Sequence, residues 1–197
     1  GFKNHAAGGG SVSLGQENVA WGTTNFTAGY QNVAGDTSSA VGTSGSATAM
    51  GHGTLAQGRS SFTGNLFTSA INQASAAIGL GTISDNFGML AIGVNNVAGL
   101  GDITIDPNDY GGYYYADGEY TGTTPGVAFV VGNGDIDSSN GRAGDNPSNA
   151  FIVYYDGDAT LSGDLTVNSD ARLKSNIMSL GSTLSKLLLI DGKKYTM

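Results

Sequence analysis

Short apolar stretches that close on a glycine recur along the first half of the chain. They are Ser13-Leu14-Gly15, Ala20-Trp21-Gly22, Thr27-Ala28-Gly29, Ala40-Val41-Gly42, Ala49-Met50-Gly51, Ala56-Gln57-Gly58, Ala77-Ile78-Gly79 and Ala91-Ile92-Gly93. The glycines at 15, 22 and 29 are seven residues apart, and those at 79 and 93 are fourteen apart. Recurrence at such short, similar steps predicts a fold built from repeats.

A step of seven residues suits a strand of about four residues followed by a tight turn. Two steps then make one coil of about fourteen residues, and stacked coils bond to their neighbours. Inward positions in such a stack must be small, and glycine supplies the positive φ that the turns need. The nine-residue step from Gly42 to Gly51 departs from this spacing, and the repeat is weak over 59–74. We therefore expect an insertion or an irregular coil at 59–74.

Residues 11–99 resemble the YadA-like head repeats of trimeric autotransporter adhesins, and similar repeats occur in phage tail fibres. The resemblance rests on segments such as Ser39-Ala40-Val41-Gly42 and Ser75-Ala76-Ala77-Ile78-Gly79. It implies a left-handed parallel β-roll in which three rolls pack side by side. On this basis, residues 1–99 form the predicted glycine-rich β-roll region.

Residues 100–167 differ from the repeats and predict a small β-domain with long loops, rich in Tyr and Asp. Alternating or apolar runs predict strands at 127–131, 150–155 and 161–167, with a loop over 132–149. Asp156-Gly157 is typical of a hairpin turn.

The spacing changes again in residues 168–197. Four leucines and an isoleucine there fall on one face of a helix: Ile177, Leu180, Leu184, Leu187 and Leu188. Asp191-Gly192 is expected to end this helix. The predicted fold is thus all-β, a homotrimeric left-handed parallel β-roll followed by a small β-domain and a short C-terminal helix.

The composition indicates a core that is either thin or shared between chains. Of 197 residues, 33 are Gly and only 42 are Leu, Ile, Val or Phe, which is little material for a core in a single chain. The chain has no cysteine, so its stability must come from repetition or oligomerisation. A net charge of −8 disfavours binding to nucleic acid, and no apolar run is long enough to predict membrane insertion.

The start of the last region carries the most specific motif of the chain. It resembles the first part of the endosialidase-type intramolecular chaperone domain found at the C-termini of phage tail spikes and fibres, through Ser169, Asp170, Arg172, Lys174, Ile177, Gly192 and Tyr195. The resemblance implies assistance to trimerisation and self-cleavage between Asn168 and Ser169, with Ser169 as nucleophile and Lys174 as its base. The family's domain is much longer than 168–197, so we expect no cleavage in this chain and leave self-cleavage at Asn168-Ser169 open for the full-length protein. Alternatively, Ser169 and Asp170 cap a turn.

Aromatic residues are the candidates for receptor contact. Five tyrosines cluster in the acidic segment: Tyr110, Tyr113, Tyr114, Tyr115 and Tyr120. Exposed aromatic rings with polar tips suit recognition, but the same rings can fill the space between three chains. Trp21 lies on a repeat strand, where packing is the favoured role.

No cofactor is predicted, and the metal candidates are weak. Asp106 and Asp117 bracket a segment that faintly matches a calcium loop, and Asp135, Asp137 and Asn140 form a second candidate for Ca²⁺. Polar turns explain both. His5 and His52 have no acidic or Cys partner nearby in the sequence, so we expect no metal site there.

We expect a structural, non-enzymatic segment of a trimeric fibre that mediates attachment to a cell surface, as a phage tail fibre or a surface adhesin. Its partners would be two further copies of itself, other fibre or tail proteins, and a glycan or protein receptor. It would be located on the virion tail fibre or at the cell surface. The alternatives are a tail-spike polysaccharide depolymerase and a calcium-stabilised surface-layer or adhesin module.

Overall fold

The computed structural model describes residues 1–37, 45–100 and 126–165. The chain divides into two compact units, Gly1–Asp164 and Leu165–Met197, and every element below belongs to the first. Within the described residues the secondary structure is all β, with no helix. The predicted C-terminal helix over 177–190 lies outside them.

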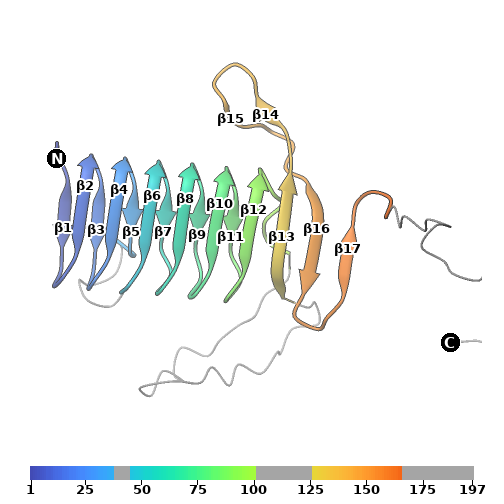
Figure 1. The fold of residues 1–197 in the computed structure, drawn as a ribbon, viewed down its shortest axis with the longest axis horizontal. Coiled ribbons are helices and arrows are strands. Elements are labelled where there is room, and N and C mark those ends of the chain that lie inside the picture. Colours follow the sequence, from blue (N-terminus) through green and yellow to red (C-terminus); the bar gives the residue numbers. More distant parts are fainter. Residues whose placement is uncertain (38–44, 101–125, 166–197) are drawn as a thin grey trace, which may run out of the picture. The chain divides into compact units, whose positions relative to one another are not determined.

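Two sheets face each other in the first unit, and sheet B lies behind sheet A in Figure 1. Sheet B has six short strands: β1 (His5–Ala7), β3 (Val19–Trp21), β5 (Val33–Ala34), β7 (Leu55–Ala56), β9 (Ser69–Ala70) and β11 (Ile83–Ser84). Sheet A has nine: β2 (Val12–Gln16), β4 (Phe26–Tyr30), β6 (Thr48–His52), β8 (Phe62–Leu66), β10 (Ala76–Leu80), β12 (Leu90–Val94), β13 (Val127–Asn133), β16 (Asn149–Tyr154) and β17 (Ala159–Leu161).

The first twelve strands form a parallel β-solenoid of six coils, each with one sheet B strand followed by one sheet A strand. Pairing is parallel throughout the coils, and the usual step is fourteen residues, as in Val12↔Phe26 and Ala76↔Leu90. The coil of about fourteen residues that the glycine spacing predicts is therefore confirmed. Each coil hydrogen-bonds to the coils before and after it, which is the arrangement of a repeat protein.

The irregular coil does not lie where the sequence predicts it. Strand β8 pairs at fourteen-residue steps on both sides, so the expected irregularity at 59–74 is wrong. The register instead jumps by 22 residues at Phe26↔Thr48, an excess of eight over 14. The extra residues fall between Gly35 and Gly45, because Gly45 is back in register with Thr23.

The interior of the solenoid consists of small side chains. Alternate residues of each strand point inward, and most of these are alanine, serine or threonine. Among the residues with no measurable exposure are Ala20, Ala34, Ala49, Ala56, Ala70, Ala77 and Ala91. The prediction that inward positions are small is confirmed, and the two sheets can lie close together for this reason.

The next-to-last residue of each sheet A strand in the coils has a positive φ and is usually glycine. Gly79 has a φ of +135°, and a Cβ placed there would lie 1.9 Å from the backbone oxygen of Gly93 in the next coil. A side chain at Gly79 would therefore clash with the next coil. In β8 the position is taken by Asn65, with a φ of 83°, and asparagine is one of the few residues that tolerate this region.

Buried amides bond adjacent coils at the corner that follows sheet A. The Asn32 side chain donates to the backbone oxygens of Ala28 and Gly51, at 2.9 and 2.7 Å, and its Oδ1 accepts from the Thr54 backbone N–H at 3.0 Å. Asn18 makes the corresponding bonds one coil earlier. These polar groups are buried but satisfied, as buried polar groups must be.

Beyond the last coil, sheet A continues without sheet B. Strand β13 pairs in parallel with β12, and β16 and β17 follow in antiparallel order. Val127, Val130, Ile152 and Met89 form the largest apolar core there. The strands predicted at 127–131 and 150–155 are confirmed, whereas the last strand, predicted at 161–167, occupies Ala159–Leu161.

The loop predicted over 132–149 contains a small hairpin. Strand β14 (Ile136–Asp137) pairs with β15 (Arg142–Ala143) in antiparallel fashion. The sequence gives little sign of these strands, because each is only two residues long and both are rich in turn-forming neighbours.

Candidate functional site

The outward face of sheet A carries two apolar rows, which we call the apolar stripe. One row is Val12, Phe26, Thr48, Phe62, Ala76, Leu90, Phe129, Val153 and Ala159, and the other is Leu14, Ala28, Met50, Gly64, Ile78, Ile92, Val131, Phe151 and Leu161. The strand register aligns the members of each row across all nine strands. The stripe therefore exists because the same alternation of small inward and larger outward residues recurs in every coil.

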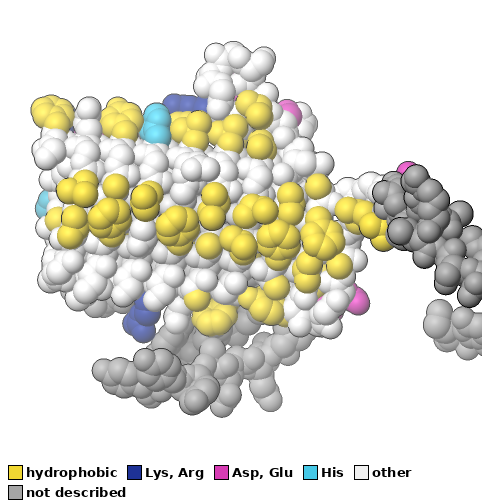
Figure 2. Space-filling view, viewed as in Figure 1, with side chains coloured by type: hydrophobic (Ala, Val, Ile, Leu, Met, Phe, Trp, Pro, Cys, Tyr) yellow, Lys and Arg dark blue, Asp and Glu magenta, His cyan; other side chains and the backbone are white. Residues whose placement is uncertain are grey.

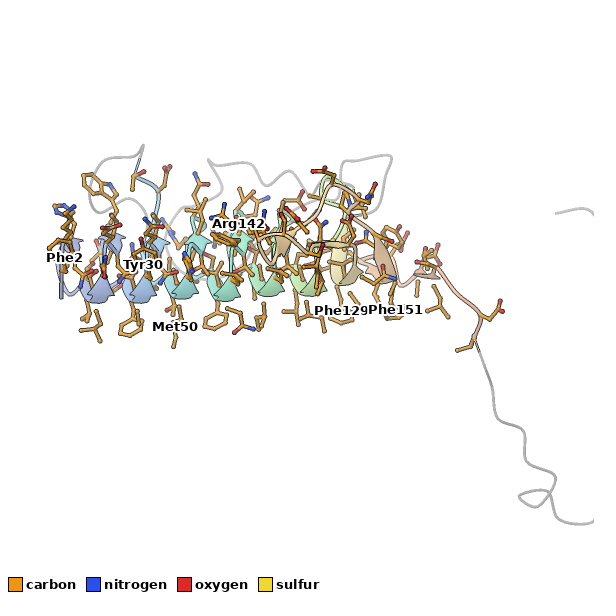
Figure 3. All side chains as sticks on the ribbon, turned by 90° about the horizontal axis from the view of Figure 1, so that it is seen from above. Phe2, Tyr30, Met50, Phe129, Arg142 and Phe151 are labelled. Carbon is orange, nitrogen blue, oxygen red and sulfur yellow. The ribbon has the colours of Figure 1, made fainter. Side chains whose placement is uncertain are left out.

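Every member of the apolar stripe except Gly64 is exposed or half-buried. The fractional exposure is 53% at Leu14, 43% at Met50 and 43% at Leu161. Figure 2 shows a continuous band of hydrophobic side chains across this face. In Figure 3 the side chains of Met50, Phe129 and Phe151 project from the same side of the sheet. The larger apolar side chains of the coils are thus outside and the smallest are inside.

In β4, β6, β8 and β10 a large residue of one row stands beside a small residue of the other row. Phe62 shares its strand with Gly64, and atoms of its ring lie 3.4 and 3.6 Å from where a Gly64 Cβ would be. Thr48 shares a strand with Met50, and Ala76 shares one with Ile78. No member of either row is charged. An uncharged apolar surface on an exposed sheet is typical of a protein interaction site.

A second cluster, which we call the aromatic corner, lies where the sheet A strands of the coils end and consists of Tyr30, His52 and Phe67. The rings of Tyr30 and His52 have centroids 4.8 Å apart, and those of His52 and Phe67 are 5.0 Å apart. The Arg142 guanidinium lies 4.5 Å from the Phe67 ring centroid. This contact attaches the β14–β15 hairpin to the solenoid, since a cation over a ring face is attractive.

The hairpin has further contacts along the same corner. The Asn95 side chain donates to the backbone oxygen of Gly144 at 2.9 Å. Gly81 lies so close to Ala143 that a Cβ on the glycine would be 2.4 Å from the Ala143 Cβ. Phe67, Gly81 and Asn95 occupy equivalent positions in successive coils, so three coils support the hairpin.

The candidate acidic ligands of this hairpin bond to their own loop. The Asp135 carboxylate accepts from the side chain and the backbone N–H of Asn146 at 2.8 and 2.9 Å, and these bonds lower its pKa. The Asp137 carboxylate accepts from the hydroxyl and backbone N–H of Ser139, which lowers its pKa as well, and it also accepts from Asn140. Among the described residues no group of three or more His, Asp or Glu is placed to hold a metal ion.

The structure separates the two histidines. His5 is on β1 of sheet B and stacks on Trp21, with ring centroids 6.1 Å apart. His52 is on β6 of sheet A, within the aromatic corner.

Most other predicted site residues lie outside the described part of the chain. These are Ser169 and Lys174, the tyrosines at 110, 113, 114, 115 and 120, and the calcium-loop candidates Asp106 and Asp117. The roles assigned to them stay predictions.

Sequence reasoning missed both the apolar stripe and the aromatic corner. The stripe had a usable signal, because the residues one and three positions before each repeat glycine are mostly apolar. The corner had none, since Arg142 is 75 positions after Phe67 in the chain.

The fold and its surfaces define a class, that of parallel β-solenoid repeat proteins. Comparison with protein-family models, with curated protein sequences and with solved structures finds no match. In the described residues, no helix is long and apolar enough to cross a membrane.

Proposed function

We propose that this chain is a structural segment of a homotrimeric fibre that attaches to a cell surface. The observation that carries the proposal is the inverted distribution of side chains in the coils, with alanine inside and the larger aliphatic and aromatic residues outside. Burying apolar area is the main favourable term in folding, and here much of that area stays exposed in a single copy. Association of copies would bury it.

The finer features of the proposal come from the resemblance to YadA-like heads and tail fibres. They are the left-handed winding, the copy number of three, and the chaperone-like C-terminal segment. A rigid rod of stacked coils suits a shaft, and the loops and hairpin at its edges suit contact with a glycan or protein receptor. The chaperone-like motif favours a phage-type tail fibre over a bacterial adhesin.

Size-exclusion chromatography with light scattering tests the proposal on the full chain. One copy has a mass of 19.9 kDa, so a trimer gives three times that mass, close to 60 kDa. We expect the trimer mass together with elution earlier than a globular protein of equal mass. A mass of 19.9 kDa at micromolar concentration would contradict the proposal.

A further inference from the structure

We propose that the copies meet through the apolar stripe of sheet A along all nine strands, and that the outer face of sheet B faces away from the assembly. This inference rests on the proposed oligomeric function and adds to it the surface and the occupant. The occupants are the other copies of this chain, whose own stripes have the same length and spacing, so that in a trimer the three stripes face one common axis.

The two outer faces of the solenoid differ in exposed apolar residues. The stripe contributes six large apolar side chains that are at least 36% exposed: Val12, Leu14, Met50, Ile78, Leu90 and Leu161. On sheet B, among the described residues, Ile71 at the end of β9 is the one such side chain, at 43%. Sheet A is therefore the face that gains more from being covered.

Charge is compatible with contact through this face. Each copy carries a net charge of −8, so two copies repel at most approaches. The stripe has no charged residue in either row. Two copies can therefore meet there without burying an unpaired charge, which is costly in an interface.

The dimensions of the stripe agree with a stable interface. Nine strands spaced about 4.8 Å apart give a length of about 40 Å, and a strand of five residues is about 17 Å long. A flat strip of this size has an area on the order of 600 Å², and projecting side chains add to its accessible surface. This is close to the roughly 800 Å² per partner of a standard interface.

The stripe also continues past the coils. Phe151 and Leu161 extend it onto β16 and β17, where sheet A has no sheet B strand behind it. Every residue of β17 is exposed in the single copy. A partner that covers only the coils would leave this end bare, whereas a second copy matches the whole sheet.

Three side chains with the same exposure of 43% allow a matched test: Met50 and Leu161 on the stripe and Ile71 on sheet B. Each is changed to Asp in the full chain, and mass is measured by light scattering over a concentration series. We expect Met50→Asp and Leu161→Asp to weaken association about tenfold or more, because each buries a carboxylate in the interface. Ile71→Asp should leave it unchanged. Met50→Leu should also associate normally, since it keeps the volume and polarity of the site.

The outcomes separate the two proposals. A monomeric wild-type chain overturns the proposed function itself. A trimeric wild type that Ile71→Asp dissociates, alone or together with the stripe variants, overturns the assignment of sheet A and leaves the proposed function standing. Far-UV circular dichroism identifies any variant that fails to fold. If Met50→Asp fails to fold, Leu161→Asp provides the test of the interface. Leu161 lies outside the coils, so its substitution does not disturb the pairing of their strands.

Discussion

Sheet A and sheet B of the solenoid are alike inside and different outside. Both present alanine, serine and threonine to the shared interior, with Ala49 and Ala77 on one side and Ala56 and Ala70 on the other. Outside, sheet A carries the apolar stripe and extends beyond the coils, whereas sheet B stops after six short strands. The interior thus sets how the coils stack, and the exterior is what distinguishes one sheet from the other as a surface.

The largest expected effect comes from the positive-φ glycine near the end of the sheet A strands, such as Gly79 in β10. Gly79→Ala puts a Cβ 1.9 Å from the Gly93 backbone oxygen at a φ of +135°. We expect a loss of about 3 kcal/mol or more in the free energy of unfolding.

The control is Gly64→Ala, on the neighbouring strand of the same sheet. Gly64 has no positive φ, and the nearest atom to a Cβ placed there would be a Phe62 ring carbon at 3.4 Å. That substitution should cost less than about 1 kcal/mol. Urea denaturation of both variants checks the pair, and equal losses would show that the backbone approach does not limit the coil.

Overpacking the interior should affect the two sheets alike. Ala49→Leu in sheet A and Ala56→Leu in sheet B each add a branched side chain where the exposure is 0%. We expect each to cost about 2 kcal/mol, because neighbouring coils must shift to make room. Thermal melting of both variants measures this. A loss at only one of them would show that the interior, too, distinguishes the sheets.

The hairpin on the corner between the sheets should respond more weakly. Arg142→Ala removes the cation above the Phe67 ring, and we expect a loss of about 0.5–1 kcal/mol that is confined to the hairpin. Hydrogen exchange at Arg142 and Ala143 reports the change.

Lys3→Ala is the matched control, because Lys3 also lies over a ring, that of Phe2 at 5.1 Å, but holds no hairpin. Faster exchange throughout the coils in Arg142→Ala would contradict a local role.

Acid should loosen the hairpin before it affects either sheet. Hydrogen bonds lower the pKa of Asp135 and Asp137 in the folded chain, so their contribution is complete above the ordinary Asp pKa of about 3.9. It is lost as the pH falls through the lowered values. Both groups are exposed, so the effect is small.

Amide exchange followed from neutral pH to below about pH 4 should show protection falling at the hairpin first. Asp135→Asn should flatten that dependence. Loss of protection at the hairpin near neutral pH would count against this account.

The sequence predicted the coil but misplaced its irregularity, for a reason that two residues explain. Asn65 takes the positive-φ position that glycine has in the other coils. The glycine of the sequence motif there, Gly64, is therefore one position early, and the repeat looks weak although the coil is regular. In a chain rich in alanine and glycine, Ala40-Val41-Gly42 matches the motif although Gly29 pairs with Gly51. Register depends on pairing between coils, such as the Ala47 N–H bonded to Asn25, and short motifs do not record it.

The candidate surfaces were harder to predict than the coil. Local alternation shows that residues such as Met50 point away from Ala49, but it does not show that nine strands align them into one face. That alignment needs β16 and β17, which join sheet A after a long break in the repeat. The Arg142 contact with Phe67 likewise depends on where the hairpin folds back, which no spacing in the sequence encodes.

The additional residues between Gly35 and Gly45 have a consequence for how such rods can vary. The strands before and after them keep equivalent parallel partners, so the coils hold their register although this turn of the chain has more residues. The length of the chain between these two glycines is therefore independent of the strand pairing. Foreign peptides inserted between Gly35 and Gly45 should leave the pairing of the coils unchanged, which makes this position suitable for peptide display.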